Sequence, residues 1–244
     1  MNKPYIFAHR GGMGYCIENT LECFRKAADM RVGVETDVQI TKDEILVCFH
    51  DTGFKIKERS YIIRKLTLEE LRSIQFEDKR KIPTVKELFN AFSYCPNTFR
   101  YSLDIVNKKA GLALIDLVEE FSYFDQVEIT DTRIQLLGNL RKHNKRIKLV
   151  YTVPFNIIKL NEIEVDYERL HNNNIIKLNL KYDRASEENF KIAIDNGFKF
   201  YCWGVNSRNR MKKVLNLRYK DEFVSAIYTD YPDVLKKLRD KLFN

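Results

Sequence analysis

Two acidic residues near the start of the chain are spaced for metal chemistry. Residues 34–40 read VETDVQI, and if they form a β-strand, its alternation turns Glu35 and Asp37 to the same face. Two carboxylates at such a short separation repel each other and are costly to bury. A divalent cation between them therefore stabilises the arrangement. A half-solvated edge strand would produce the same alternation, and short motifs of this kind give many false positives.

A titratable side chain follows a short distance along the sequence. After the turn-like segment 41–44, a second apolar run at 45–49 leads back toward the two acids and ends at His50 and Asp51. A metal-binding pair and an imidazole can therefore meet at one place. The alternative is that His50 and Asp51 only end a strand and open a turn.

The composition is that of a soluble globular protein. Of the 244 residues, 44% are hydrophobic and 31% are charged, which suits one large domain or two small ones and argues against disorder. The first residues, MNKPYIFAHR, lack the apolar region of a secretory signal, and no run is long enough to span a membrane. We therefore expect the whole chain to be the mature, cytoplasmic protein, with peripheral membrane contact left open.

The cysteines and the net charge exclude further classes. The cysteines are odd in number and lack the CxxC spacing of zinc sites, so we expect reduced and mostly buried thiols. The net charge of +8 could attract anionic lipids, nucleic acids or phosphate esters. Because no stacking aromatic residues interrupt the basic segment 141–146, we predict no nucleic-acid binding. The five cysteines are Cys16, Cys23, Cys48, Cys95 and Cys202.

Short apolar runs alternate with amphipathic segments along the whole chain, which predicts alternating strands and helices. Strands are expected at 5–8, 34–39, 100–105, 126–129, 147–150, 175–178, 199–202 and 226–229. Helices are expected to begin near residues 20, 85, 110, 132, 156, 186 and 207, with a last helix at 233–242. Start signals are Asn19 with Glu22 and Thr67 before 68–70, and Gly197 marks a helix end.

These alternating elements predict a single α/β domain over residues 1–244, a closed (β/α)8 TIM barrel. A doubly wound open sheet is the main rival. The irregular segment 52–83, with a short helix near 68–74, is expected to be an elaborated loop on the barrel. Catalytic groups of such barrels lie at the carboxyl ends of the strands. Polar residues that fall there are His9, Arg10, Glu35, Asp37 and Asp104.

An ordered set of motifs resembles the glycerophosphodiester phosphodiesterase family over nearly the full chain. No single triplet would be specific, but the number of motifs and their order make the resemblance specific. The motifs are His9-Arg10-Gly11, Glu18-Asn19-Thr20-Leu21, Glu35-Thr36-Asp37-Val38, Thr41-Lys42-Asp43, His50-Asp51, residues 82–88, Leu103-Asp104-Ile105, Trp203-Gly204-Val205-Asn206 and residues 228–233.

The resemblance implies a phosphodiesterase-type barrel that hydrolyses a glycerophosphodiester to sn-glycerol 3-phosphate and an alcohol. Oxygen ligands suit Mg²⁺ or Ca²⁺ better than zinc, and imidazole can donate or accept a proton near neutral pH. Direct attack by water and a cyclic phosphate route both remain open. The resemblance implies these roles: metal ligands Glu35, Asp37 and Asp104, acid–base residues His9 and His50, and phosphate-binding Arg10.

Four further residues have supporting roles in this interpretation. Trp203 could stack on the substrate or only pack at the barrel rim, and Asn19 is either a helix cap or a site residue. Glu18 is expected to support Arg10. Asp51 either orients the neighbouring histidine or caps a turn.

Three positions depart from the family pattern. Asp104 stands where the family usually has Glu, which retracts the carboxylate and could change the metal preference. Val106 stands where the family has a lysine, which removes a phosphate contact. Ile17 replaces a proline, for which only a loop adjustment is expected. Later strands offer three substitutes for the missing lysine: Lys148, Lys177 and Lys181.

We therefore expect a metal-dependent enzyme that acts on small glycerophosphodiesters. A lysophospholipase D specificity is one alternative, since the same site would serve a larger lipid. A catalytically impaired barrel that binds phosphodiesters is another, motivated by Asp104 and Val106. A lyase or isomerase would need a lysine base at a strand end, which no motif provides. The sequence does not indicate the oligomeric state or the leaving alcohol.

Overall fold

Strands follow one another around a closed sheet. The computed structural model describes residues 3–243, and β1 pairs with both β13 and β2 to close a ring of eight parallel strands. The predicted (β/α)8 barrel is therefore confirmed, and the open-sheet alternative is wrong. The barrel strands are β1 (Tyr5–Ala8), β2 (Gly33–Ile40), β6 (Tyr101–Ile105), β7 (Val127–Asp131), β8 (Lys148–Thr152), β9 (Lys177–Lys181), β10 (Lys199–Trp203) and β13 (Ala226–Thr229).

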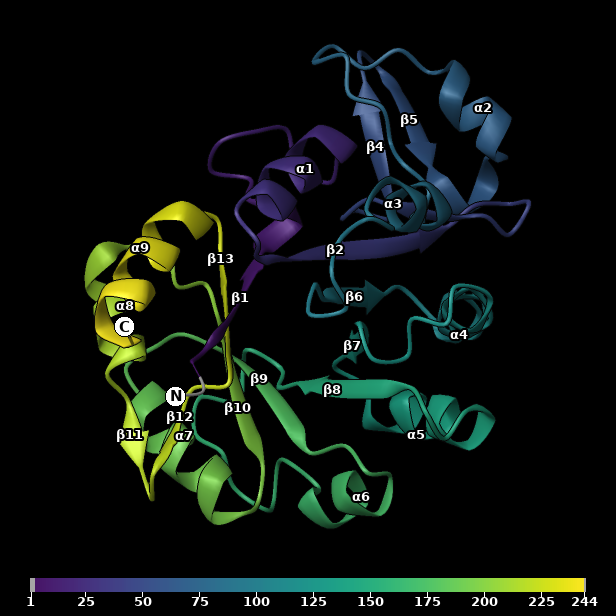
Figure 1. Ribbon diagram of the computed structural model, residues 1–244. Helices are drawn as coiled ribbons and strands as arrows, with labels where there is room; N and C mark the ends of the chain where they lie inside the picture. Colours follow the sequence, from purple (N-terminus) through teal and green to yellow (C-terminus); the bar gives the residue numbers. More distant parts are fainter. Residues whose placement is uncertain (1–2, 244) are drawn as a thin grey trace.

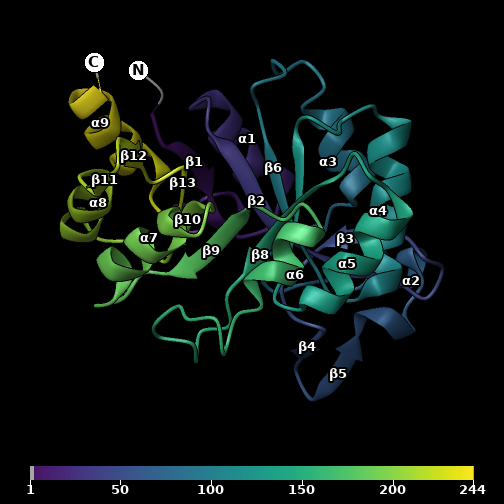
Figure 2. The same ribbon diagram turned by 90° about the horizontal axis from the view of Figure 1, so that it is seen from below.

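Helices cover the outside of the barrel (Figure 1, Figure 2). Most of them connect one barrel strand to the next, so all barrel strands point the same way and their carboxyl ends share one rim. The helices are α1 (Leu21–Asp29), α3 (Val85–Ala91), α4 (Lys108–Glu120), α5 (Ile134–His143), α6 (Tyr167–Asn172), α7 (Ser186–Asp195), α8 (Arg208–Leu215) and α9 (Pro232–Phe243).

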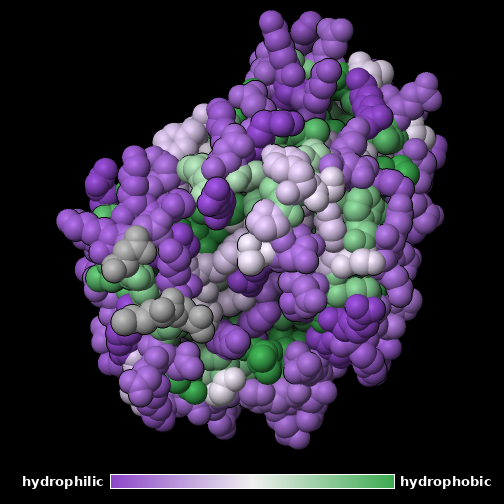
Figure 3. All heavy atoms as spheres, viewed as in Figure 1, coloured by the Kyte–Doolittle hydropathy of each residue, from purple (hydrophilic) through white to green (hydrophobic). Residues whose placement is uncertain are grey.

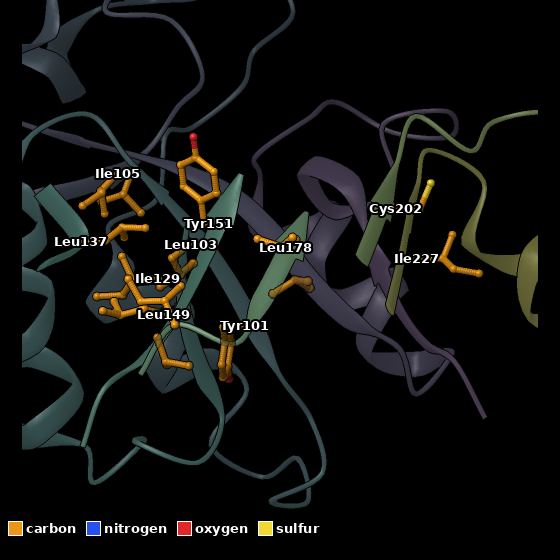
Figure 4. Packing of buried hydrophobic residues seen from close by; sticks show 14 of the residues in the cluster. Tyr101, Leu103, Ile105, Ile129, Leu137, Leu149, Tyr151, Leu178, Cys202 and Ile227 are labelled. Atoms are coloured by element: carbon orange, nitrogen blue, oxygen red, sulfur yellow. The ribbon is translucent and has the colours of Figure 1, made fainter. Parts of the chain in front are cut away.

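Alternate side chains of each strand enter two different apolar layers. On β1, Ile6 packs in the layer between the sheet and the helices, whereas Phe7 lies inside the barrel. Figure 4 shows part of the outer layer, where Ile129 and Leu149 of neighbouring strands lie close to Leu137 of α5. Each such buried side chain contributes about 1.5–3 kcal/mol by leaving water. This packing fixes which residues of each strand can face the interior.

The segment between β2 and α3 forms a lobe, defined here as residues 52–83, that projects beyond the barrel (Figure 1, Figure 2). An apolar cluster of its own, which includes Val47, Ile63 and Leu71, attaches it to β3. The predicted loop is therefore a small packed unit on the barrel. The additional elements are β3 (Leu46–Cys48), antiparallel to β2, the hairpin β4 (Gly53–Ile56) and β5 (Arg59–Ile62), α2 (Leu68–Ser73), and the hairpin β11 (Arg218–Tyr219) and β12 (Glu222–Phe223).

One predicted helix does not form. The segment 154–166 has no helix, and α6 begins only at Tyr167. The apolar residues of this segment are divided, since Leu160 and Val165 are buried in the core, whereas Phe155 is 79% exposed and Ile163 is 97% exposed. The side chain of Asn189 binds this loop instead, accepting from the Leu160 N–H at 2.9 Å. The segment therefore packs on the core as an irregular loop and not as a helix.

The predicted helix ends are mostly confirmed. Thr67 and Glu70 form the capping box that starts α2, and Gly197 follows the end of α7 with a φ of 77°. The cap of α1 is a correction, because the residue whose side chain accepts from the helix is Thr20 and not Asn19.

The cysteine prediction is wrong for one pair. Cys16 and Cys23 form a disulfide, with their Cα atoms 5.5 Å apart. The bridge joins the loop after β1 to the first turn of α1. The spacing of the cysteines in the sequence did not indicate that this loop turns back onto the helix. Cys48, Cys95 and Cys202 are free, and the first and last of these are buried as expected. Disulfides are uncommon in reducing compartments, so the cytoplasmic location stays a prediction that this pair does not support.

The surface is hydrophilic over most of the face in Figure 3, and apolar side chains appear mainly in its recesses. Within residues 3–243, no helix is both long enough and apolar enough to cross a bilayer.

Candidate active site

His9 lies at the carboxyl end of β1, in the short 3-10 turn His9–Gly11. Its Nδ1 atom is 2.7 Å from Oδ1 of Asp230, which follows β13, and its Nε2 atom is 3.9 Å from Oε2 of Glu35. Burial disfavours the charged imidazole, but these two carboxylates outweigh burial and raise the pKa of His9. The ring is therefore held by one acid and can carry a proton near neutral pH.

Arg10 occupies the middle of the same turn, with a φ of 48° that is uncommon outside glycine. In this conformation its backbone N–H donates to Oε2 of Glu35 at 2.8 Å. The guanidinium donates to Glu18 at 2.8 Å, and its Nε atom is 3.6 Å from Oδ2 of Asp37. Burial opposes the charge of Arg10, but these acids raise its pKa. Glu18 thus lies where a residue that supports Arg10 is expected.

The three acids expected to bind metal lie on neighbouring strands. Asp37 of β2 pairs in register with Asp104 of β6, and Glu35 lies two residues earlier on the same face of β2. Burial raises the pKa of Glu35 to about 7, although His9 opposes the shift. Burial also raises the pKa of Asp104, and the carboxylates of Asp37 and Glu35 raise it further. The site therefore holds more negative charge than its cations offset.

This excess of carboxylate bears on the expected metal. In the described part of the chain, Oδ2 of Asp37 is buried without a hydrogen-bond partner. Carboxylate oxygens are the donors that Mg²⁺ and Ca²⁺ prefer, so the donor chemistry fits. The geometry is not preassembled, because across residues 3–243 no three His, Cys, Asp or Glu side chains are grouped to hold an ion. The acids are neighbours in the sheet, but their side chains do not converge as placed.

His50 follows β3, which lies beside β2, the strand that carries Glu35 and Asp37. The N–H of Phe49 donates to the carbonyl of Asp37 at 2.9 Å, so the second apolar run returns next to the acids as predicted. The His50 Nδ1 atom is 2.7 Å from Oδ1 of Asp51, and the ring is half-exposed. Asp51 therefore contacts the imidazole and does more than cap a turn. In the region that the structure describes, His50 makes no hydrogen bond or ion pair with His9.

Asn19 and Trp203 have different surroundings. Asn19 is buried and accepts a hydrogen bond at 2.7 Å from the hydroxyl of Thr36, which alternates with the acids and faces away from them. Trp203 ends β10 at the rim, with the Lys181 ammonium 5.4 Å from the centre of its ring. Its indole Nε1 atom is buried and has no partner among residues 3–243.

Four polar residues at this rim received no role in the sequence analysis. Asp230 holds His9 and also accepts from Asn206 at 2.5 Å. Asp131 ends β7 and is bound by Arg133. Their position at or just after a strand end is the signal that could have found them, because the same signal selected Asp104.

Two of the suggested replacements for the missing lysine are wrong. Lys148 and Lys177 are the first residues of β8 and β9, so they lie at the amino end of the barrel, opposite to His9. Lys177 is bound to Glu128 there, at 2.5 Å. Lys181 ends β9 and therefore lies on the same rim as His9.

Known proteins are similar to this chain along almost its whole length. The model of the Glycerophosphoryl diester phosphodiesterase family matches residues 9–234. A glycerophosphodiester phosphodiesterase of Caldanaerobacter subterraneus is 25% identical, over 97% of this chain and 98% of that protein. The human lysophospholipase D GDPD1 is 25% identical, over 97% of this chain and 85% of that protein. The solved phosphodiesterase of Oleispira antarctica in complex with the product sn-glycerol-3-phosphate has a TM-score of 0.81 and 21% identity, over 98% of this chain and 97% of that chain.

Proposed function

Because the chain belongs to the glycerophosphoryl diester phosphodiesterase family, we propose that it hydrolyses a glycerophosphodiester to sn-glycerol 3-phosphate and an alcohol, as a single catalytic domain. The observation that carries this proposal is His9, which is held between Asp230 and Glu35 and directly precedes Arg10. A titratable group thus lies next to a guanidinium that can bind a phosphate oxygen. The relative with bound sn-glycerol-3-phosphate supports the same class of product.

The two histidines divide the proton transfers in this proposal. His50, oriented by Asp51, takes a proton from water as the water oxygen bonds to phosphorus. His9, whose pKa is raised by carboxylates despite burial, gives its proton to the alcohol oxygen as the P–O bond breaks. Arg10 donates to a non-bridging oxygen and offsets the charge that builds there. A neighbouring glycerol hydroxyl could attack instead of water, which would give a cyclic phosphate first and would use the same residues.

A divalent metal ion, Mg²⁺ or Ca²⁺, forms the second part of the proposal, with Glu35, Asp37 and Asp104 as its ligands. Two observations support it: Oδ2 of Asp37 has no hydrogen-bond partner among the described residues, and burial, together with neighbouring carboxylates, raises the pKa values of the other two acids, so a cation there would favour their charged forms. When bound, the ion would stabilise negative charge on the phosphate.

A cleft beside the lobe favours a second candidate function, the release of the head group of a lysophospholipid. The cleft measures about 1120 Å³ and lies between the start of α1 and residues 71–83, with a lining that combines apolar residues such as Phe76 with charged ones. Arg80 also lines it and is 4.0 Å from Glu18, the partner of Arg10. An acyl chain could lie in this cleft while the phosphate is bound at Arg10. The human relative named lysophospholipase D supports this candidate.

One set of assays tests both candidates. The protein is incubated with glycerophosphocholine, glycerophosphoethanolamine or lysophosphatidylcholine in Mg²⁺ or Ca²⁺, and sn-glycerol 3-phosphate or choline is measured, with EDTA as the control. We expect turnover of the small diesters that EDTA abolishes. Faster turnover of lysophosphatidylcholine would favour the second candidate, and activity that survives EDTA would contradict the metal. Binding of a diester without any turnover would identify a phosphodiester-binding barrel instead.

A further inference from the structure

A second arginine lies at the same end of the barrel as Arg10. Arg133 follows β7 and reaches across to β6, where its Nη2 atom donates to the carbonyl oxygens of Ile105 at 3.2 Å and Val106 at 3.1 Å. Its Nε and Nη2 atoms also donate to the two oxygens of Asp131, at 2.8 and 2.5 Å. These contacts with two strands fix the position of the guanidinium.

Part of this guanidinium is available to a ligand. The Arg133 side chain is 49% exposed, and its Nη1 atom, with two N–H donors, makes no hydrogen bond to the residues that the structure describes. Helix α5 begins directly after Arg133, and no side chain caps its first turn. The partial positive charge of the helix N-terminus therefore adds to that of the guanidinium.

The positive charge of Arg133 lies near position 106, where the side chain carries no charge. Val106 is apolar and packs against the outer core layer, although the family motif that it resembles has a lysine at this position. Arg133 brings a cation to the backbone of Val106 from the next strand. A cation that one strand lacks is thus supplied by its neighbour.

Two arginines flank the row of acids at this rim. Arg10 lies beside Asp37 on β2, Asp104 follows in register on β6, and Arg133 comes two residues after the end of β7, the strand whose Thr130 pairs with Asp104. Neighbouring strands are about 4.8 Å apart, so the row extends over about 10 Å. The carboxylates in the middle repel an anionic ester, whereas N–H donors attract it at both ends. The strand ends on both sides of Asp104 therefore carry a guanidinium, that of Arg10 near β2 and that of Arg133 after β7.

We propose that Arg133 is a second phosphate-binding residue, which takes the place of the lysine absent at position 106. The inference rests on the proposed function, because it assumes that a phosphodiester binds at this rim. The Nη1 donors of Arg133 bind a phosphate oxygen of the substrate and of sn-glycerol 3-phosphate, on the side opposite to Arg10. Asp131 is a positioning residue that orients this guanidinium.

Two measurements on purified variants test the proposal. Steady-state kinetics with glycerophosphocholine give KM and kcat at a fixed metal concentration, and calorimetry gives the dissociation constant of sn-glycerol 3-phosphate. We expect Arg133→Ala to raise KM and this dissociation constant roughly 10- to 100-fold, as for the loss of a charge-assisted hydrogen bond. Arg133→Lys should keep part of the affinity, because the charge remains but the planar fork is lost. Lys148→Ala, which removes a cation at the opposite end of the barrel, is the matched control.

Relocating the charge separates binding from a structural role. Val106→Lys in the Arg133→Ala background should recover at least about fivefold in KM and product affinity, since it returns a cation to the same strand end. Val106→Met in that background, which adds length without charge, should recover nothing. If Arg133 only held β6 to β7, lysine at position 106 would not help, and thermal unfolding of each variant shows which ones are folded.

The outcomes distinguish a failure of the inference from a failure of the proposed function. An Arg133→Ala variant within twofold of the wild type in KM and product affinity overturns the inference alone. A double variant with lysine at position 106 that is no better than Arg133→Ala also overturns it. A wild-type protein that neither hydrolyses a diester nor binds sn-glycerol 3-phosphate overturns the proposed function, and the inference with it.

Discussion

The two ends of the barrel both bury carboxylates, but they compensate them differently. At the amino end, Glu128 is 1% exposed, and its Oε1 atom lies 2.6 Å from Arg100 and 2.5 Å from Lys177. Burial alone would raise the pKa of Glu128, but these two cations lower it. At the carboxyl end, burial raises the pKa values of Glu35 and Asp104, and neighbouring acids raise them further.

This difference distinguishes a structural cluster from a binding site. Glu128 also accepts from the hydroxyl of Tyr201 at 3.1 Å, so the contacts of its Oε1 atom join several strands, although its Oε2 atom has no hydrogen-bond partner among the described residues. The acids at the carboxyl end have weaker compensation, since Glu35 accepts from the backbone N–H of Arg10 and the Arg10 guanidinium lies 3.6 Å from Asp37, so a further cation or ligand would stabilise them. The two ends therefore differ in how far cations compensate their carboxylates, and not in whether those carboxylates are buried.

Among substitutions at the carboxyl end, replacement of His9 should have the largest effect on catalytic activity. We expect His9→Ala to lower kcat/KM for glycerophosphocholine by about 10²–10⁴-fold, the usual contribution of general acid–base catalysis. Stability should change little, because the side chain is partly exposed. His143→Ala is the control, since that half-exposed side chain lies at the end of α5. A variant that keeps more than a tenth of the activity would assign proton transfer to another group.

Removal of Glu128 should have the largest effect on stability. We expect Glu128→Ala to lower the free energy of unfolding by about 3–5 kcal/mol, because it leaves Arg100 and Lys177 buried without an anion. Urea unfolding at pH 7 measures this change, and KM of the folded fraction should stay the same. Glu120→Ala, which breaks the exposed pair with Lys86, is the control and should cost at most about 1 kcal/mol. A similar small loss for Glu128 would remove the contrast between the two ends.

The pH dependence of stability should differ between the two ends. A carboxyl with a raised pKa binds more protons in the folded chain, so the contribution of Glu35 falls as the pH rises from about 4.5 to 7. The contribution of Glu128, with a lowered pKa, is present above its ordinary value and is lost only at lower pH. In metal-free protein, we expect Glu35→Gln to remove about 2 kcal/mol of the decline in unfolding free energy between pH 5 and 8. Glu128→Gln should leave that decline in place, and a flat wild-type profile would contradict both statements.

Neutralising Asp104 should have the smallest effect on stability. In metal-free protein, Asp104→Asn should leave the free energy of unfolding unchanged or raise it by up to about 1 kcal/mol, because an amide is not repelled by the neighbouring acids. Urea unfolding measures this change. The proposed metal site predicts that Mg²⁺ raises the melting temperature of the wild type, and the same variant should lose that rise. A loss of more than about 2 kcal/mol would mean that Asp104 stabilises the fold.

Local patterns predicted the barrel better than they predicted contacts across it. Strands β1 and β13 have the predicted bounds, because each is a short apolar run between polar residues. The helix near residue 156 was wrong, because apolar spacing does not show whether a core is present to cover Ile163. The pair of His9 and Asp230 joins residues 221 positions apart, so it exists only once the barrel closes. The strand-end rule that selected Asp104 would have selected Asp230 and Asp131 as well.

The bridge between Cys16 and Cys23 ties the stretch that carries Glu18 to α1. Glu18 in turn holds the guanidinium of Arg10. A covalent link therefore limits the movement of a group expected to grip the phosphate. This link forms by oxidation of two thiols, so a thiol reductant would release the segment that carries Glu18 from α1. Catalytic rates measured with and without reductant would then refer to two covalent forms of the chain.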